Sequence, residues 1–137
     1  MIGRSLIFLT STIAILLLVT GCGEKHVGLT PAPTVPAAIG SADLSPDDNG
    51  NTVVDLKVQH LAKPEDLKPS RAVYVVWIQP PGADPIKQGQ LKVNDNLEGE
   101  LRTPTTYKRF KIFITAEDSA SVIRPSGQEV FHRHIID

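Results

Sequence analysis

Apolar and polar residues alternate along most of the second half of the chain. Over residues 52–59, every second side chain from Val54 onward is apolar, which predicts a strand with one buried face. Residues 71–79, RAVYVVWIQ, are apolar on both faces and predict a central strand that is covered on both sides. The same alternation predicts further strands over residues 107–116 and 129–136.

Two more apolar segments, residues 86–93 and 97–102, flank an Asn-Asp-Asn tripeptide. Asn and Asp accept left-handed backbone geometry, so this pattern predicts a β-hairpin. The proline-rich residues 80–85 predict a turn, because neither a helix nor an inner strand tolerates that proline density. Short strands separated by turns, with no convincing helix, indicate an all-β fold: a small immunoglobulin-like antiparallel β-sandwich over residues 51–137.

The N-terminal residues have a different pattern. Arg4 is the only charged residue before Leu6–Val19, a run of fourteen residues without a charge. As a helix this run reaches about 21 Å, short of the roughly 30 Å hydrocarbon core of a bilayer. Residues 1–21 therefore resemble a signal peptide more than a membrane span, although Thr20 and Gly21 extend the run toward a marginal anchor.

The one cysteine of the chain, Cys22, follows this run directly. Val19, Thr20, Gly21 and Cys22 resemble the lipobox of bacterial lipoproteins, in which an aliphatic residue, a small residue and Gly or Ala precede an obligatory Cys. The resemblance implies a diacylglyceryl thioether on Cys22, cleavage after Gly21, and a further acyl chain on the new amino terminus. Two or three acyl chains hold a protein on a membrane essentially permanently. The alternative is an ordinary secretory signal that is cleaved near an unmodified Cys.

Residues 22–50 connect this predicted lipid anchor to the predicted sandwich. From Gly23 onward the segment has four prolines and no aromatic residue, a composition that is typical of a flexible, extended tether. The sequence therefore predicts three parts: a signal peptide over residues 1–21, a lipidated Cys with a disordered tether over residues 22–50, and the β-sandwich. Such a tether would hold the sandwich tens of ångströms from the lipid surface.

Charge and cysteine content restrict the partners. The chain has 14 Lys and Arg against 15 Asp and Glu, so we expect no nucleic-acid partner. Lys108, Arg109 and Lys111 form a local basic stretch, which we interpret as a solvated face. A single cysteine excludes an intramolecular disulfide, and an acylated Cys22 would have no free thiol for redox chemistry.

Residues 74–127 resemble the extracytoplasmic C-terminal domain of anti-sigma-K factors. The shared features are a Y-x-V-W strand, a Gly/Pro turn, a short hairpin that ends in G-x-L, a strand with an F-x-V/I-T-x-E-like ending, and a P-x-G turn. These are packing signatures, so the resemblance implies a fold and not an activity. Those factors carry a cytoplasmic sigma-binding domain and a membrane span before this module. A lipobox and a tether stand there in this chain, so no direct sigma-factor binding is expected.

A metal site is one candidate for chemistry. His132 and His134 lie two residues apart on a predicted strand and would project from the same face. Both imidazoles could bind one copper or zinc ion, with His60 or Glu129 as further ligands. The simpler interpretation is that these histidines form a polar face on a terminal strand. We expect copper or zinc as a cofactor only if this metal site exists.

A carboxylate pair is a second candidate. Glu98 and Glu100 share a predicted strand face, and acid hydrolysis of a glycosidic bond requires two such groups. Their place in a short hairpin favours cross-strand pairing with Lys92 or Lys87 instead. No serine lies in a G-x-S-x-G motif, so we expect no catalytic residues and no enzyme activity.

Together these patterns predict a lipid-anchored, extracytoplasmic protein of the bacterial envelope. Its partners would be the membrane, through the lipid on Cys22, and another envelope protein that the sandwich binds in an interaction, sensing or structural role. The alternative is an extracytoplasmic copper- or zinc-binding module that uses His132 and His134. Gly23 replaces the Asp that retains enteric lipoproteins in the inner membrane, which favours the outer membrane if the cell has two.

Overall fold

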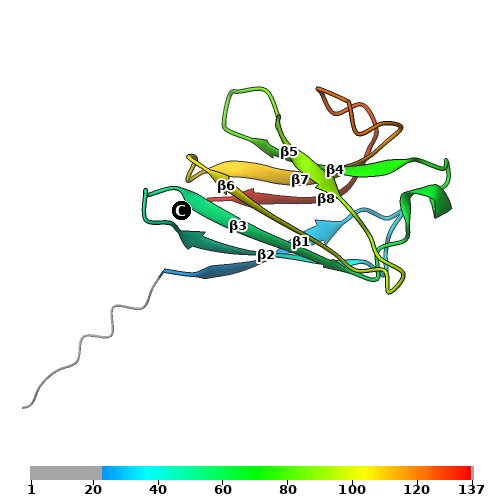
Figure 1. Cartoon of the computed structure of the whole chain (residues 1–137), viewed down its shortest axis with the longest axis horizontal. Coiled ribbons are helices and arrows are strands. Elements are labelled where there is room, and N and C mark those ends of the chain that lie inside the picture. Colours follow the sequence, from blue (N-terminus) through cyan, green and yellow to red (C-terminus); the bar gives the residue numbers. More distant parts are fainter. Residues whose placement is uncertain (1–22, 137) are drawn as a thin grey trace, which may run out of the picture.

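The computed structural model describes residues 23–136; the predicted signal peptide and lipidation site lie outside the described residues. The described chain is all-β, with one short 3₁₀ turn (Figure 1). In chain order its elements are β1 (Lys25–Pro31), β2 (Ile39–Pro46), β3 (Thr52–Gln59), η1 (Pro64–Asp66), β4 (Val73–Gln79), β5 (Ile86–Leu91), β6 (Gly99–Thr105), β7 (Phe110–Glu117) and β8 (Gln128–Ile135). Within residues 23–136, no helix has the length and apolar character needed to cross a bilayer.

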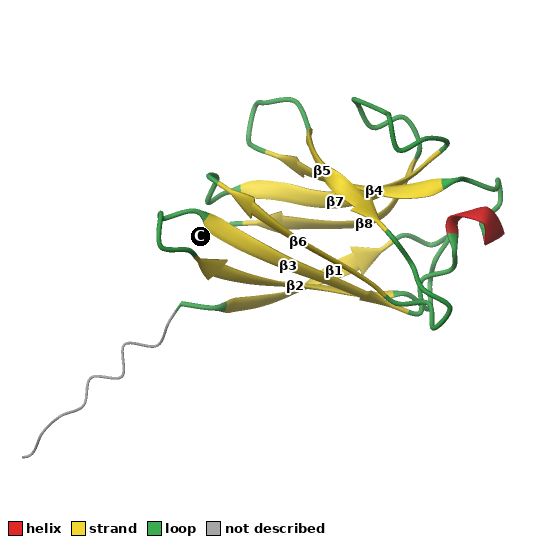
Figure 2. Ribbon diagram, viewed as in Figure 1, coloured by secondary structure: helices red, strands yellow, loops and turns green. Residues whose placement is uncertain are grey.

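The strands form two antiparallel layers that are joined along β1. The hydrogen-bonded order is β5-β4-β7-β8-β1-β2-β3-β6. Lys25–Leu29 of β1 pair with β2, whereas Thr30 and Pro31 pair with β8, so β1 belongs to both layers. Figure 2 shows β1, β2, β3 and β6 stacked against β4, β5, β7 and β8. The predicted all-β antiparallel fold is confirmed, with a barrel-like closure on the β1 side.

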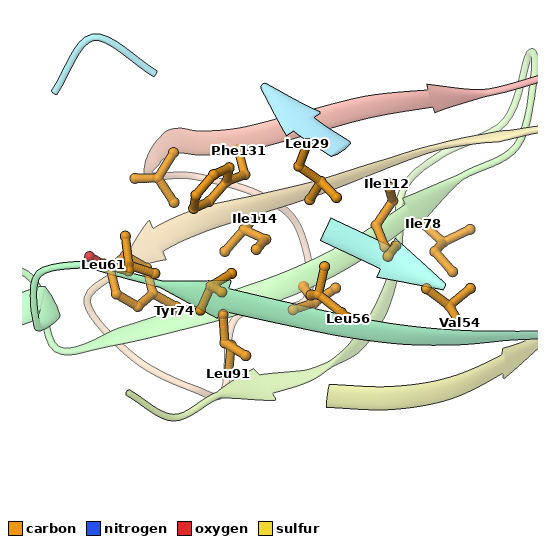
Figure 3. Packing of buried hydrophobic residues seen from close by; sticks show 14 of the residues in the cluster. Leu29, Val54, Leu56, Leu61, Tyr74, Ile78, Leu91, Ile112, Ile114 and Phe131 are labelled. Atoms are coloured by element: carbon orange, nitrogen blue, oxygen red, sulfur yellow. The ribbon is translucent and has the colours of Figure 1, made fainter. Parts of the chain in front are cut away.

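The main core lies between the two layers. Val54, Leu56 and Val58 of β3 are at most 1% exposed, as their alternation with polar residues predicts. Side chains of the opposite layer complete the cluster, and Figure 3 shows several of them meeting between the ribbons. Its largest fully buried members in the other strands and loops are Leu61, Tyr74, Ile78, Leu91, Ile112, Ile114 and Phe131.

A second, smaller apolar cluster lies on the outer face of β4 and β7. Val75, Trp77 and Phe113 form it, with Val73 and Val122 packed against them. The rings of Trp77 and Phe113 are stacked with their centroids 6.5 Å apart. This cluster confirms the prediction that β4 is covered on both faces.

The prediction of a disordered tether over residues 22–50 is wrong. This segment supplies β1 and β2, and its two strands bury Val27, Leu29, Ala42 and Leu44 in the main core. These four residues do alternate with polar or small ones, but Gly, Ser and Ala between them weaken the strand signal. Among the described residues the first strand therefore begins at Lys25, and the sandwich is not confined to residues 51–137.

Of the four prolines that suggested a tether, Pro31 and Pro46 are the last residues of β1 and β2, and the other two lie between these strands. Pro33 and Pro36 are in the β1–β2 connection, which is closed by hydrogen bonds from Val35 N to Ala32 O and from Ala38 N to Val35 O, both 3.0 Å. Val35 and Ala38 are each 5% exposed and join the main core. Proline content here marks a tight, packed loop.

The predicted hairpin over residues 86–102 is also wrong in its pairing. β5 pairs with β4, and β6 pairs with β3, so the chain crosses from one layer to the other at residues 92–98. The amide of Asn94 donates to the carbonyl of Glu98 at 2.8 Å, which closes this turn. Gly99 is required beside it, because a Cβ there would lie 2.8 Å from the carbonyl oxygen of Lys92.

Candidate functional site

We call the layer formed by β1, β2, β3 and β6 the first layer. Its outer face carries a row of charged residues that crosses all four strands. Strand register places His26, Asp43, Asp55 and Arg102 side by side. His26 Nδ1 lies 2.5 Å from Asp43 Oδ1, and Arg102 Nη1 lies 2.5 Å from Asp55 Oδ2. The two central carboxylates are thus each paired outward, which offsets their mutual repulsion and leaves a solvated, ion-paired face.

Glu98 and Glu100 do not form a catalytic pair in a cleft. Both are exposed, Glu98 in the turn before β6 and Glu100 on β6 opposite Lys57. Lys87, one of the predicted partners, donates its amine instead to the carbonyls of Ala120 and Val122. The prediction that Lys87 pairs with these glutamates is wrong, because β5 and β6 lie in different layers.

His132 and His134 lie on β8, opposite Phe113 and Lys111 of β7. His132 Nδ1 is 2.9 Å from Glu129 Oε1, and the other oxygen of Glu129 accepts a hydrogen bond from Lys111 Nζ at 2.7 Å. His60 follows β3 in the other layer. Among residues 23–136, no group of three or more His, Cys, Asp or Glu side chains is placed to hold a metal ion.

A buried carboxylate that sequence reasoning missed lies at the end of β7. Glu117 is 1% exposed, and its oxygens accept hydrogen bonds from the hydroxyls of Thr115 and Ser126, each at 2.6 Å. Burial would raise the pKa of Glu117, but these bonds and the amides of Ser126 and Gly127 hold that pKa below its ordinary value. Thr115 in turn accepts a bond from Trp77 Nε1 at 2.8 Å.

This carboxylate fixes the loop between β7 and β8 over the outer cluster. Gly127 packs so closely against β7 that a Cβ there would lie 1.7 Å from the carbonyl oxygen of Ala116. Lys87 holds the middle of the loop through two carbonyls, and Val122 covers the cluster. Ile123 at the loop surface is 83% exposed. The available sequence signal is the Thr-Ala-Glu ending of β7 with Ser126-Gly127 at the far end of the next loop, a pattern that by itself indicates only a strand end and a turn.

Two shallow depressions lie at the N-terminal end of the sandwich, which we define by the start of β1, the β2–β3 turn, the β6–β7 connection and Ile136. In Figure 1 the start of β1 and the C-terminus lie together at this end. The depressions share Ile135 and Ile136 and have volumes of about 320 and 350 Å³.

Basic side chains are the charged groups of both depressions. The first is lined by Lys25 and Lys108, and the second by Arg109, Lys111 and His134; no Asp or Glu among the described residues lines either one. Lys108, Arg109 and Lys111 are the basic stretch seen in the sequence, but sequence spacing gave no sign that Lys25 and His134 join it at one end of the fold.

Hydrogen bonds to the backbone fix the lysines of the first depression. Lys25 Nζ donates to the carbonyl of Ile136 at 2.8 Å. Lys108 Nζ donates to the carbonyl of Gly50 at 2.6 Å and to the hydroxyl of Thr52 at 3.3 Å. Within the described part of the chain, neither ammonium forms an ion pair with a carboxylate.

Comparison with protein-family models, with curated proteins and with solved structures finds no significant match to this chain. The resemblance to the C-terminal domain of anti-sigma-K factors, like the lipobox, therefore stays a prediction.

Proposed function

We propose that this chain is a lipid-anchored protein of the bacterial envelope whose β-sandwich is a non-catalytic interaction, sensing or structural module. The observation that carries the proposal is the Val-Thr-Gly-Cys sequence ending at Cys22, directly after an uncharged apolar run. Acyl chains on Cys22 would hold the protein on the outside of a membrane.

Two structural features support a role in binding another protein and not in catalysis. The buried carboxylate of Glu117 is saturated by hydrogen bonds from Thr115, Ser126 and Gly127, which makes it a structural group. The outer face of the first layer presents paired charges on a rigid sheet, a surface suited to polar recognition by another protein.

Cys22→Ala in the full chain tests the anchor. In a bacterial host, we expect the unchanged protein to fractionate with membranes and to carry acyl mass on Cys22, and the variant to lose both. Ser11→Ala, which leaves the four lipobox residues intact, is the matched control. If the variant lacks acyl chains and still fractionates wholly with membranes, the proposal that lipid on Cys22 anchors the protein is wrong.

Cross-linking in the native cell, followed by recovery of the tagged protein and mass spectrometry, tests the interaction role. Recovery of one envelope protein in near-equal amount is the expected result. A charge-reversed variant of the first layer, Arg102→Glu, shows whether the ion-paired face is the contact surface. Recovery of nothing above background would contradict the interaction role.

A second candidate function is binding of copper or zinc at His132 and His134. The contact between His132 and Glu129 favours it, because a carboxylate oxygen lies 2.9 Å from one of the two imidazoles. Titration of the metal-free protein with zinc or copper should show micromolar binding that is lost in His132→Ala/His134→Ala. Unchanged binding in that variant, or none in the parent protein, would remove this candidate; His60→Ala is the control.

A further inference from the structure

We propose that the N-terminal end of the sandwich docks onto the lipid head groups of the membrane that holds Cys22, with the basic side chains of its two depressions binding lipid phosphates. This inference rests on the proposed lipid anchor. The fold itself supplies the other arguments, namely the length of the link, the charge of the depressions and the apolar side chains beside them.

The link between the predicted lipid and the fold is very short. Gly23 and Glu24 alone separate Cys22 from Lys25, the first residue of β1. Three extended residue steps span at most about 10 Å. A domain held so closely must place its N-terminal end at the head groups, in contrast to the tens of ångströms that a disordered tether would allow.

The charge of the two depressions suits a phosphate layer. Lys25, Lys108 and Arg109 lie in adjoining depressions without a lining carboxylate among the described residues. Three acidic residues lie at this end, Glu24 beside Lys25 and Asp47 and Asp48 on the β2–β3 turn, and none of them lines either depression. Asp47 Oδ1 accepts hydrogen bonds from the backbone amides of Asn49 and Asn51, both 2.8 Å. Basic residues near an anionic lipid surface each strengthen binding about fivefold.

Apolar side chains at the same end suit the boundary between head groups and acyl chains. Ile136 is 62% exposed between the two depressions, and Tyr107 in the β6–β7 connection is 39% exposed. An aliphatic and an aromatic side chain among basic residues is the composition of a membrane-interface contact.

The test uses the full chain, acylated and reconstituted in vesicles of phosphatidylethanolamine and phosphatidylglycerol. Cys22 is the only natural cysteine, so Asn49→Cys or Asn96→Cys gives one labelled position at the N-terminal or at the opposite end. An insertion of about 15 Gly and Ser residues between Gly23 and Glu24 removes the constraint of the short link. With the long link, the domain stays at the membrane only if its N-terminal end binds the lipid head groups.

With this insertion, we expect stronger energy transfer to a head-group-labelled lipid from position 49 than from position 96. Lys25→Gln/Lys108→Gln/Arg109→Gln should lower the ratio of docked to free domain by on the order of a hundredfold. The matched control, Lys57→Gln/Lys92→Gln/Arg124→Gln, removes the same charge elsewhere and should leave the ratio within about twofold.

The outcomes separate the docking surface from the anchor. Equal transfer from the two labels, or an equal loss in the control variant, would overturn the docking surface while the acyl mass on Cys22 still supports the anchor. A Cys22 without acyl chains would overturn the proposed function and this inference together. Thermal unfolding of each variant identifies any loss of signal that comes from unfolding.

Discussion

The indole nitrogen of Trp77 lies 2.8 Å from the hydroxyl oxygen of Thr115, and that hydroxyl donates a hydrogen bond to the buried carboxylate of Glu117. A polar chain therefore runs from the centre of β4 through β7 to the loop that covers both strands. Within residues 23–136 every buried side-chain nitrogen and oxygen has a hydrogen-bond partner, so the network stabilises the loop as long as it stays complete.

Glu117→Ala should destabilise the fold by about 2 to 4 kcal/mol, because the hydroxyls of Thr115 and Ser126 lose a charged acceptor in a buried site. Urea unfolding of the two proteins measures this difference. Glu98→Ala, at an exposed position, should change the free energy of unfolding by less than about 0.5 kcal/mol. Similar effects at the two positions would contradict the structural role of Glu117.

The same carboxylate should make stability depend on pH. Hydrogen bonds hold the pKa of Glu117 in the folded state below its ordinary value of 4.5. Its stabilising contribution is therefore complete above that value and is lost as the pH falls through the folded pKa. The difference in unfolding free energy between the parent protein and Glu117→Gln should thus shrink between pH 7 and pH 3. A constant difference would show that ionisation of Glu117 does not stabilise the fold.

Gly127→Ala should displace the β7–β8 loop, because the new Cβ would overlap the carbonyl oxygen of Ala116. Trp77 is the only tryptophan, so its fluorescence reports directly on the cover that this loop provides. We expect a red-shifted emission in the variant. Gly28→Ala, where a Cβ would meet no atom within 4 Å, should keep the emission of the parent protein.

Tyr74→Phe should cost about 1 to 2 kcal/mol. The hydroxyl of Tyr74 donates to the carbonyl of Ala62 at 2.7 Å, and the ring is fully buried. Tyr107→Phe removes the same atom from a half-exposed ring and should be neutral. Chemical denaturation of the two variants checks the pair, and equal losses would argue against the buried hydrogen bond.

The strands that apolar alternation predicted lie where expected, because each buries a full row of large side chains. Val54, Leu56 and Val58 show this on β3, and Trp77 with its neighbours shows it on β4. β1 and β2 were missed because Gly28, Gly40 and the small residues near them carry little apolar signal. Gly40 is small for a physical reason, since a Cβ there would lie 2.9 Å from the ring of Phe131.

Pairing between strands was less predictable than the strands themselves. Leu91 and Leu101 both face the core, but from opposite layers, and the turn between them satisfies a hairpin and a layer crossing equally well. The basic depressions and the Glu117 network could not be predicted, because each joins segments that only the tertiary fold brings together. Lys25 and Lys108, for example, are far apart in the sequence.

β1 also has a mechanical consequence. A pull on the chain at Cys22 would act along the axis of β1, whose residues Lys25–Leu29 pair with β2 and whose last two residues pair with β8. If a partner held the opposite end of the sandwich, the load would be shared among these hydrogen bonds at once, in shear, instead of peeling them apart one after another. The domain would then transmit tension between the membrane and its partner while remaining folded.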